Sequence, residues 1–144
     1  MNTPTAEIVN FEPANTGSLA PSLVVILASG PEDGGKRATL AYTAAVTALG
    51  MDSPVKIFLA GDGAWWGYED RCDDYRINGF PPLDELVDTF RELGGETWIC
   101  STCDQYCGIP GDGDNAGRTR RKDVLPRGMA SVIPVIAGGS SVTF

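Results

Sequence analysis

Four cysteines are the residues of this sequence with the clearest capacity for chemistry. Three fall within eight residues, in the run Cys100-Ser-Thr-Cys103-Asp-Gln-Tyr-Cys107, and the fourth is Cys72. The chain has no histidine, which excludes Ser-His-Asp and Cys-His catalysis and every His-ligated metal site. Any reaction must therefore use thiols, carboxylates, Lys, Arg, hydroxyl groups or backbone N–H groups.

The cysteine cluster suits three kinds of chemistry. Four thiolates, Cys72 together with the three clustered cysteines, could hold a zinc ion or an iron–sulfur cluster. A CxxC pair could act as a thioredoxin-like dithiol, although that motif is expected early in its fold and here it comes late. A cysteine at a strand end, beside a helix N-terminus, could be a sulfur-handling nucleophile with a lowered pKa. Inert burial would explain Cys72 or Cys107 singly, but poorly explains three cysteines in eight residues.

Length and charge limit the class of protein. A chain of 144 residues with 42% apolar residues is expected to form about one domain with one packed core. The 19 acidic residues outnumber the 11 basic ones, and the net charge of −8 disfavours a nucleic-acid partner. No apolar run approaches the roughly 20 residues that span a bilayer, and no secretory signal is recognised at the N-terminus. We therefore expect a cytoplasmic protein with no membrane partner.

Apolar patterning predicts the elements that must position the cysteines. Continuous apolar runs are typical of strands buried on both faces, whereas apolar residues at i, i+3, i+4 and i+7 indicate helices. The predicted strands are 23–28, 55–60, 97–100 and 141–144, and the predicted helices are 36–49 and 82–93. Residues 131–137 are ambiguous; if Ser131 caps a helix there, Pro134 falls in its first turn.

The alternation of these elements predicts an α/β fold. We expect a single-domain, three-layer sandwich with a mostly parallel sheet of about five strands flanked by helices. Residues 1–21 are polar and lack an apolar period, so they are predicted to be a flexible N-terminal arm. Residues 22–144 then form the domain.

The carboxyl ends of the strands are the predicted binding site, because ligands of open parallel sheets bind there. Loops 29–35, 61–80 and 100–123 meet at this edge. The third loop carries the cysteines and a basic run, which could attract a sulfur oxyanion or an acidic partner. That run contains Arg118, Arg120, Arg121 and Lys122.

Aromatic residues are dense in the second of these loops. We interpret them as a pocket wall and subunit interface, since aromatic residues are enriched at interfaces. They are Trp65, Trp66, Tyr68 and Phe80. The predicted substrate-binding residues are Asp62, Trp65, Arg118 and Arg120.

The loop after the first strand nearly matches a phosphate-binding loop. Gly30 to Lys36 fits GxxxxGK, but Arg37 stands where the Mg²⁺-binding hydroxyl belongs. Glu32 and Asp33 also place negative charge where phosphates would bind. We interpret this segment as an ordinary turn into a helix.

The order of these segments resembles the DsrE-like family of sulfur-relay proteins over residues 23–144. The segment LVVILASGPEDGGKRATLAYTAAVTALG is similar to the family's opening strand, loop and Ala-rich helix, and VKIFLAGDGAWW to its second strand and Asp-Gly turn. LVDTFRELGGETWICSTCDQYCGI is similar to its helix, strand and active cysteine, with Gly108 eight residues past Cys100. GMASVIPVIAGGSSVTF resembles the last helix and strand.

This resemblance implies an α/β fold assembled into trimers or hexamers. It implies that Cys100 carries sulfur as a persulfide and passes it to a partner protein, and that Cys103 is the second cysteine of a CxxC subset. The expected partner is a sulfur donor or acceptor protein, such as a small sulfur carrier. The activity would be that of a sulfurtransferase, and no cofactor is expected. The alternatives are a Cys-ligated metal or iron–sulfur module and a non-catalytic subunit of a hetero-oligomer.

Overall fold

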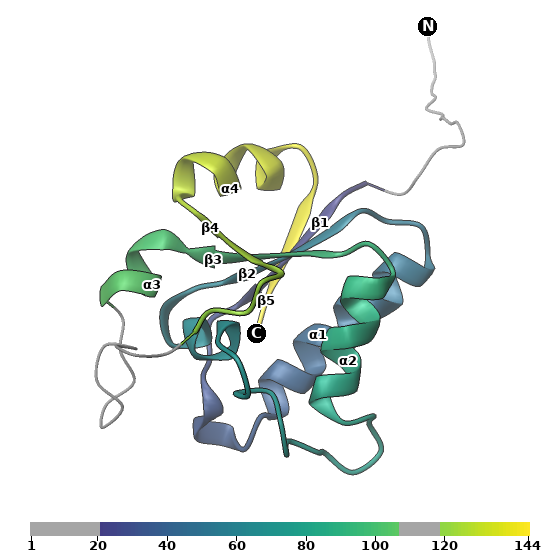
Figure 1. Cartoon of the computed structure of the whole chain (residues 1–144). Helices are drawn as coiled ribbons and strands as arrows, with labels where there is room; N and C mark the ends of the chain where they lie inside the picture. Colours follow the sequence, from purple (N-terminus) through teal and green to yellow (C-terminus); the bar gives the residue numbers. More distant parts are fainter. Residues whose placement is uncertain (1–20, 107–118) are drawn as a thin grey trace, which may run out of the picture.

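Five parallel strands form the centre of the protein, in the order β4-β3-β2-β1-β5 (Figure 1). The structure, a computed structural model, describes residues 21–106 and 119–144. The strands are β1 (Leu23–Leu27), β2 (Val55–Leu59), β3 (Glu96–Cys100), β4 (Val124–Arg127) and β5 (Ser140–Thr143). The predicted α/β sandwich is confirmed, with a sheet that is entirely parallel.

Helices cover both faces of this sheet (Figure 1). They are α1 (Lys36–Gly50), α2 (Leu83–Glu92), α3 (Ser101–Tyr106) and α4 (Met129–Ala137). The chain steps from β1 to β4 in one direction, so right-handed connections place α1 and α2 on the same face. The return from β4 to β5 runs the opposite way and leaves α4 on the other face. Two short 3-10 helices, η1 (Pro31–Asp33) and η2 (Gly61–Gly67), follow β1 and β2.

The main core lies between the sheet and the pair α1 and α2. The α1 side of this core is built from small residues, Ala38, Ala41 and Ala45, together with Tyr42. The α2 side is the predicted apolar stripe, which consists of Leu83, Leu86, Val87 and Phe90. Small side chains let α1 approach the sheet closely. The helical period of the stripe on α2 keeps its apolar side chains on the face that packs against the sheet.

A smaller core lies between the sheet and α4. Phe58, Trp98 and Cys100 from the strands pack there with Val132 of α4. Most of α4 is exposed, although its sequence MASVIPVIA is almost wholly apolar. Residues 21–106 and 119–144 therefore cover this face of the sheet only in part.

Two parts of the fold differ from the sequence-based expectation. Strand β4 lies in a segment for which no strand was predicted, because Pro126 interrupts its apolar pattern. Proline is tolerated at this position since β4 is an edge strand. The segment that was ambiguous between strand and helix is a helix, but α4 begins at Met129 with Gly128 as its N-cap. Ser131 is therefore not the cap, and Pro134 lies inside the helix rather than in its first turn. The carbonyl left unbonded by Pro134 belongs to exposed Ala130.

Several predictions fall outside the described residues. These concern the N-terminal arm, apart from Pro21, and the side chains of Cys107 and Arg118. Within residues 21–106 and 119–144, no helix is both long and apolar enough to cross a membrane.

Candidate functional site

The connections after β1, β2 and β3 meet at the carboxyl edge of the sheet, as predicted. Gly30 lies so close to Asp62 that a Cβ on Gly30 would be 3.1 Å from the Asp62 carbonyl oxygen. The Gly61 N–H donates a hydrogen bond of 3.2 Å to the Cys103 Sγ. The CxxC pair therefore lies where the β2 and β3 connections touch.

Cys100 is the last residue of β3 and directly precedes α3. Its side chain belongs to the smaller core on the α4 side and is only 8% exposed. Cys103 lies one helical turn later, and the Cys103 side chain is partly exposed. Both thiols are free, so this pair can react with an external sulfur compound or with each other.

Burial sets the protonation state of Cys100. Burial raises the pKa of its thiol above the ordinary value of 9.0, and the hydrogen bond to the Cys103 side chain also raises it. Backbone N–H groups of Cys103 and Thr102 at the start of α3 lower the pKa, but they do not outweigh burial. The expectation of a lowered pKa at this strand end is therefore wrong: Cys100 rests as a thiol, with N–H groups in place for its thiolate.

Asp104 anchors α3 to the neighbouring connection. Its carboxylate accepts a short hydrogen bond from the Tyr68 hydroxyl and lies 3.1 Å from Arg120 Nη1. Burial, and then the Asp104 carboxylate, raises the pKa of Tyr68, so this hydroxyl stays protonated and keeps donating. These contacts fix the helix that carries Cys103.

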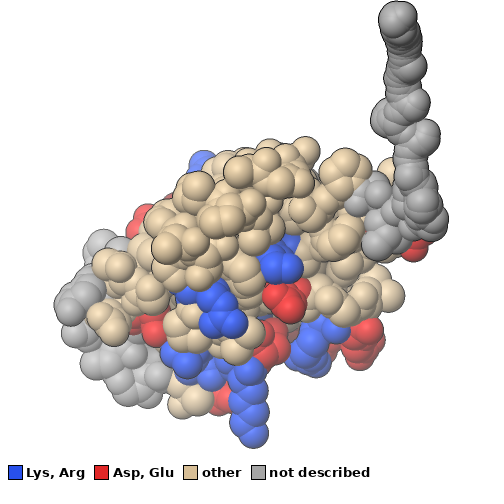
Figure 2. All heavy atoms as spheres, turned by 90° about the horizontal axis from the view of Figure 1, so that it is seen from above, with Lys and Arg blue, Asp and Glu red and all other residues tan. Residues whose placement is uncertain are grey.

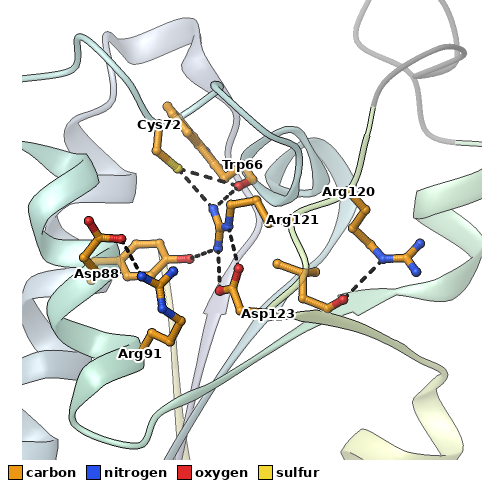
Figure 3. A network of polar contacts seen from close by, with 9 residues as sticks. Trp66, Cys72, Asp88, Arg91, Arg120, Arg121 and Asp123 are labelled. Atoms are coloured by element: carbon orange, nitrogen blue, oxygen red, sulfur yellow. Dashed lines mark hydrogen bonds and ion pairs between the residues drawn. The ribbon is translucent and has the colours of Figure 1, made fainter.

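A second set of contacts returns the chain from α3 to β4. Backbone bonds of 2.8 Å from Glu69 N–H to the Thr119 carbonyl, and 2.9 Å from Arg121 N–H to the Gly67 carbonyl, hold residues 119–121 against the end of η2. Arg120 and Arg121, although adjacent, point in opposite directions (Figure 3). The basic run is therefore divided between two environments.

Arg121 belongs to a buried network on the side of α1 and α2 (Figure 3). Its guanidinium donates to the Trp66 carbonyl at 2.6 Å and to Cys72 Sγ at 3.3 Å, and it pairs with Asp123. Burial raises the pKa of Cys72 to about 11, although Arg121 lowers it. Cys72 is therefore a protonated core residue rather than a nucleophile.

The structure does not bring Cys72 to the CxxC pair. Cys72 packs in the main core, whereas Cys100 packs in the smaller core on the opposite face of the sheet. Among the described residues, no group of three or more possible ligands is arranged to hold a metal ion. The four-thiolate arrangement considered from the sequence therefore finds no support in these positions.

The predicted substrate-binding residues have different surroundings. Asp62 is exposed and follows Gly61, which contacts Cys103. Trp65 is partly buried, with Arg71 stacked 3.7 Å from its ring centre. Arg120 is tied to Asp104 and to the Val124 carbonyl. Asp62 therefore lies next to the contact between the connections that follow β2 and β3. That these residues bind a substrate stays a prediction.

The aromatic residues of this loop serve mainly as core. Trp66 is fully buried and donates from its indole N–H to the Ser29 carbonyl at 2.8 Å, and Tyr68 is 3% exposed. The expectation that these two form a pocket wall and interface is therefore wrong. They fill the space between η2 and the sheet, which keeps the β2 connection rigid.

The loop that resembles a phosphate-binding loop carries its own anion. The Asp33 carboxylate accepts hydrogen bonds from the N–H groups of Gly35, Lys36 and Arg37, at 3.0, 3.1 and 3.0 Å. These are the N–H groups at the start of α1 that a phosphate would need. The interpretation of this segment as a turn into a helix agrees with that arrangement.

Two clefts lie away from the cysteine pair. One, of about 680 Å³, opens between Glu69, Arg91 and Lys122. The other, of about 180 Å³, is lined by Cys72 and Arg121 together with acidic residues of the α2 side. Neither is lined by Cys100 or Cys103, so these clefts are separate from the cysteine pair at the strand ends.

One residue that lies beside Cys100 could not be found from the sequence. Arg127 stands opposite Cys100 in the register of β3 and β4. Without β4, the sequence offers no reason to place residue 127 near residue 100. The only available signal was an arginine soon after the cysteine loop.

Comparisons with known proteins agree with this architecture. A model of the DsrE/DsrF-like family matches residues 22–136. The YchN protein from E. coli has a similar fold, with a TM-score of 0.62 and 14% identity over 85% of this chain and 99% of that chain. A conserved protein of unknown function from Bacteroides thetaiotaomicron, BT1422, matches with a TM-score of 0.52 and 14% identity over 85% of this chain and 95% of that one. No curated protein sequence matches significantly.

Proposed function

Since the chain belongs to the DsrE/DsrF-like family, we propose that it carries sulfane sulfur as a persulfide on Cys100 and passes it to a partner protein. The family is associated with sulfur relay. One observation supports a sulfur-carrying role for this chain: the CxxC pair lies at the carboxyl end of β3, and backbone N–H groups face the sulfur atoms of both cysteines.

Loading is a displacement at sulfur. The Cys100 thiolate attacks the sulfane sulfur of a donor, a new S–S bond forms, and the donor's own S–S bond breaks with its electron pair on the leaving group. The product is Cys100–S–S⁻. In the transfer step an acceptor thiolate attacks the outer sulfur, takes it as a persulfide, and releases the Cys100 thiolate.

Cys103 supplies a second outcome for the same intermediate. Once the persulfide is protonated to Cys100–S–SH, the Cys103 thiolate can attack the Cys100 sulfur, which expels hydrosulfide, HS⁻, and leaves a Cys100–Cys103 disulfide. Two thiols are then oxidised while the sulfane sulfur is reduced to sulfide. A partner that accepts the outer sulfur must therefore compete with Cys103.

The first test measures sulfur loading by mass. Reduced protein is treated with thiosulfate or polysulfide, its intact mass is taken, and the adduct is mapped to a peptide. We expect one added sulfur on the Cys100 peptide that dithiothreitol removes. Cys100→Ser should abolish loading, and Cys103→Ser should prolong the life of the adduct because the internal attack is lost.

Cys72→Ser is the matched control, because Cys72 is free but buried in the main core. This variant should load like the native chain. Full loading of Cys100→Ser, or a native protein that gains no sulfur from either donor, would contradict the proposal and favour a non-catalytic subunit.

We further propose that the chain works as a homo-oligomer, a trimer or a hexamer, that meets a sulfur donor or acceptor protein in the cytoplasm. Support for assembly comes from the face of α4. Met129 and Ile133 are each 55% exposed, and Figure 2 shows a broad area without charged side chains on this side, bordered by charged residues. Free thiols are in keeping with a reducing compartment.

A further inference from the structure

An arginine lies beside Cys100 on the neighbouring strand. β3 and β4 are parallel, and Cys100 is paired with Arg127 in their register. Adjacent strands are about 4.8 Å apart, and paired residues project from the same face of a sheet. The Arg127 side chain therefore starts on the α4 side, next to the Cys100 side chain.

Local contacts hold the Arg127 guanidinium in this area. Its Nη1 donates to the Pro126 carbonyl at 2.8 Å, and its Cζ lies 5.5 Å from the Trp98 ring centre. Trp98 packs in the same small core as Cys100. An arginine stacked on an aromatic ring loses little further freedom when it binds an anion, because its planar fork is already oriented.

The charge of Arg127 is not balanced by the described part of the chain. Nearby cations are paired: Lys56 with Glu96 at 3.6 Å, and Arg120 with Asp104 at 3.1 Å. Within residues 21–106 and 119–144, no carboxylate pairs with Arg127, whose partners are a carbonyl and a ring. The side chain is half-buried, so its remaining N–H groups can bind an anion more strongly than a fully solvated cation would.

We propose that Arg127 forms an anion subsite beside Cys100, which holds the oxyanion end of an anionic sulfur donor such as thiosulfate. The use of this subsite in sulfur loading rests on the proposed function, whereas its affinity for anions does not. Cys100–S⁻ attacks the sulfane sulfur of S–SO₃²⁻, and sulfite, SO₃²⁻, leaves with the electron pair of the broken S–S bond. Arg127 binds the sulfonate oxygens before and during this step, in a protein whose net charge of −8 would otherwise repel the donor.

The first arm of the test needs no sulfur donor. Cys100 is alkylated in a Cys103→Ser background with iodoacetate and with iodoacetamide, which differ mainly in charge. The ratio of the two rates is independent of the thiolate fraction, because both reagents consume the same thiolate. Arg127→Gln should lower the iodoacetate-to-iodoacetamide ratio about tenfold, which corresponds to the loss of one charge-assisted hydrogen bond. The ratio for Arg127→Lys should lie between that of the chain with Arg127 and that of Arg127→Gln.

Arg76→Gln is the matched control, since it removes the same charge from an exposed position in the connection before α2. Its ratio should stay within about twofold of the native one, as expected for a screened, distant charge. An unchanged ratio in Arg127→Gln would overturn the proposal, whatever the absolute rates. An equal fall in Arg76→Gln would also overturn it, because the effect would then be that of net charge.

The second arm measures loading at increasing thiosulfate concentrations. Arg127→Gln should raise the half-saturating concentration about tenfold, while the limiting amount of persulfide is kept. If the native chain takes no sulfur but the alkylation ratio still responds to Arg127, the carrier function fails and the anion subsite stands. If the native chain loads and Arg127→Gln loads with the same concentration dependence, the subsite fails and the carrier function stands.

Discussion

At the scale of single residues, Cys72 and Cys100 are the same side chain in two environments. Both are buried, and burial raises the pKa of both thiols. Cys72 is sealed in the main core by Arg121 and Trp66, away from the strand ends. Cys100 lies at the carboxyl edge, where Thr102 and Cys103 N–H groups face its sulfur. Position on the sheet, rather than residue type, separates the core thiol from the one that we propose to carry sulfur.

The raised pKa of Cys100 predicts a pH dependence. Thiolate forms only as the pH rises through the folded pKa, which lies above 9.0. The rate of Cys100 alkylation by iodoacetamide should therefore keep rising beyond pH 9 in the folded protein. The same peptide in urea should titrate at its ordinary pKa and level off earlier. A folded-state rate that is already constant at pH 8 would contradict this.

The raised pKa of Cys72 predicts that the stability of the fold depends on pH, because a group that binds its proton more tightly when folded stabilises the folded state. The pKa of Cys72 is about 11 in the folded chain, against an ordinary 9.0, so the folded state holds the proton more tightly. This contribution is fully present below pH 9 and is lost as the pH rises to about 11. The free energy of unfolding should fall over that range more steeply in the native chain than in Cys72→Ala. Parallel pH curves for the two proteins would contradict the assignment.

At the scale of elements, the segment that follows the cysteine loop is held by Arg121. This side chain joins residues 119–123 to the Trp66 carbonyl, Tyr42 and Cys72. Arg121→Met should lower the free energy of unfolding by about 3 kcal/mol, because it leaves the partly buried Asp123 carboxylate and the carbonyl of buried Trp66 without this partner. Urea denaturation measures this change.

Lys122→Met is the control for Arg121→Met, since Lys122 is the exposed neighbour. It should change the free energy of unfolding by no more than about 0.5 kcal/mol. A similar loss in both variants would mean that charge in the basic run, rather than the buried network, stabilises the segment.

The elements with a strong local period could be predicted from the sequence. Each of these elements has an apolar run or stripe that reflects which of its faces is buried. They are β1, β2, α1 and α2, and their predicted bounds agree with the observed ones within one residue. β4 could not be predicted, because Pro126 is tolerated only since β4 is an edge strand. The start of α4 could not be predicted either, because Pro134 is tolerated inside the helix only since the carbonyl that it leaves unbonded is exposed. Cys100 and Cys103 were predicted from the cysteine cluster together with the family resemblance, whereas Arg127 could be placed beside Cys100 only with the register of β4.

At the scale of the whole molecule, the face covered by α4 carries exposed apolar side chains. The chain has a net charge of −8, yet the area over α4 has few charges (Figure 2). Contact between two copies at this face would bury Met129 and Ile133 and bring few charges together. This is the surface through which we expect copies of the chain to assemble.

Ile133→Glu tests this surface, because a buried, unpaired carboxylate at an interface is costly. The variant should reduce the native mass, measured by light scattering, from that of an oligomer to that of a single chain. Met51→Glu is the control, since Met51 is 70% exposed at the end of α1. An oligomer that survives Ile133→Glu, or one lost equally in Met51→Glu, would place the interface elsewhere.

The place of β5 has a consequence for synthesis. β1 is made before β5, which completes one of its edges by pairing Leu23 with Ser140 and Ile26 with Thr143. Until residues 140–143 have left the ribosome, β1 therefore has an open edge, and open apolar edges pair with other chains. A messenger that ends before residue 140 should yield aggregates rather than a smaller folded protein, so β5 is the strand on which solubility during translation depends.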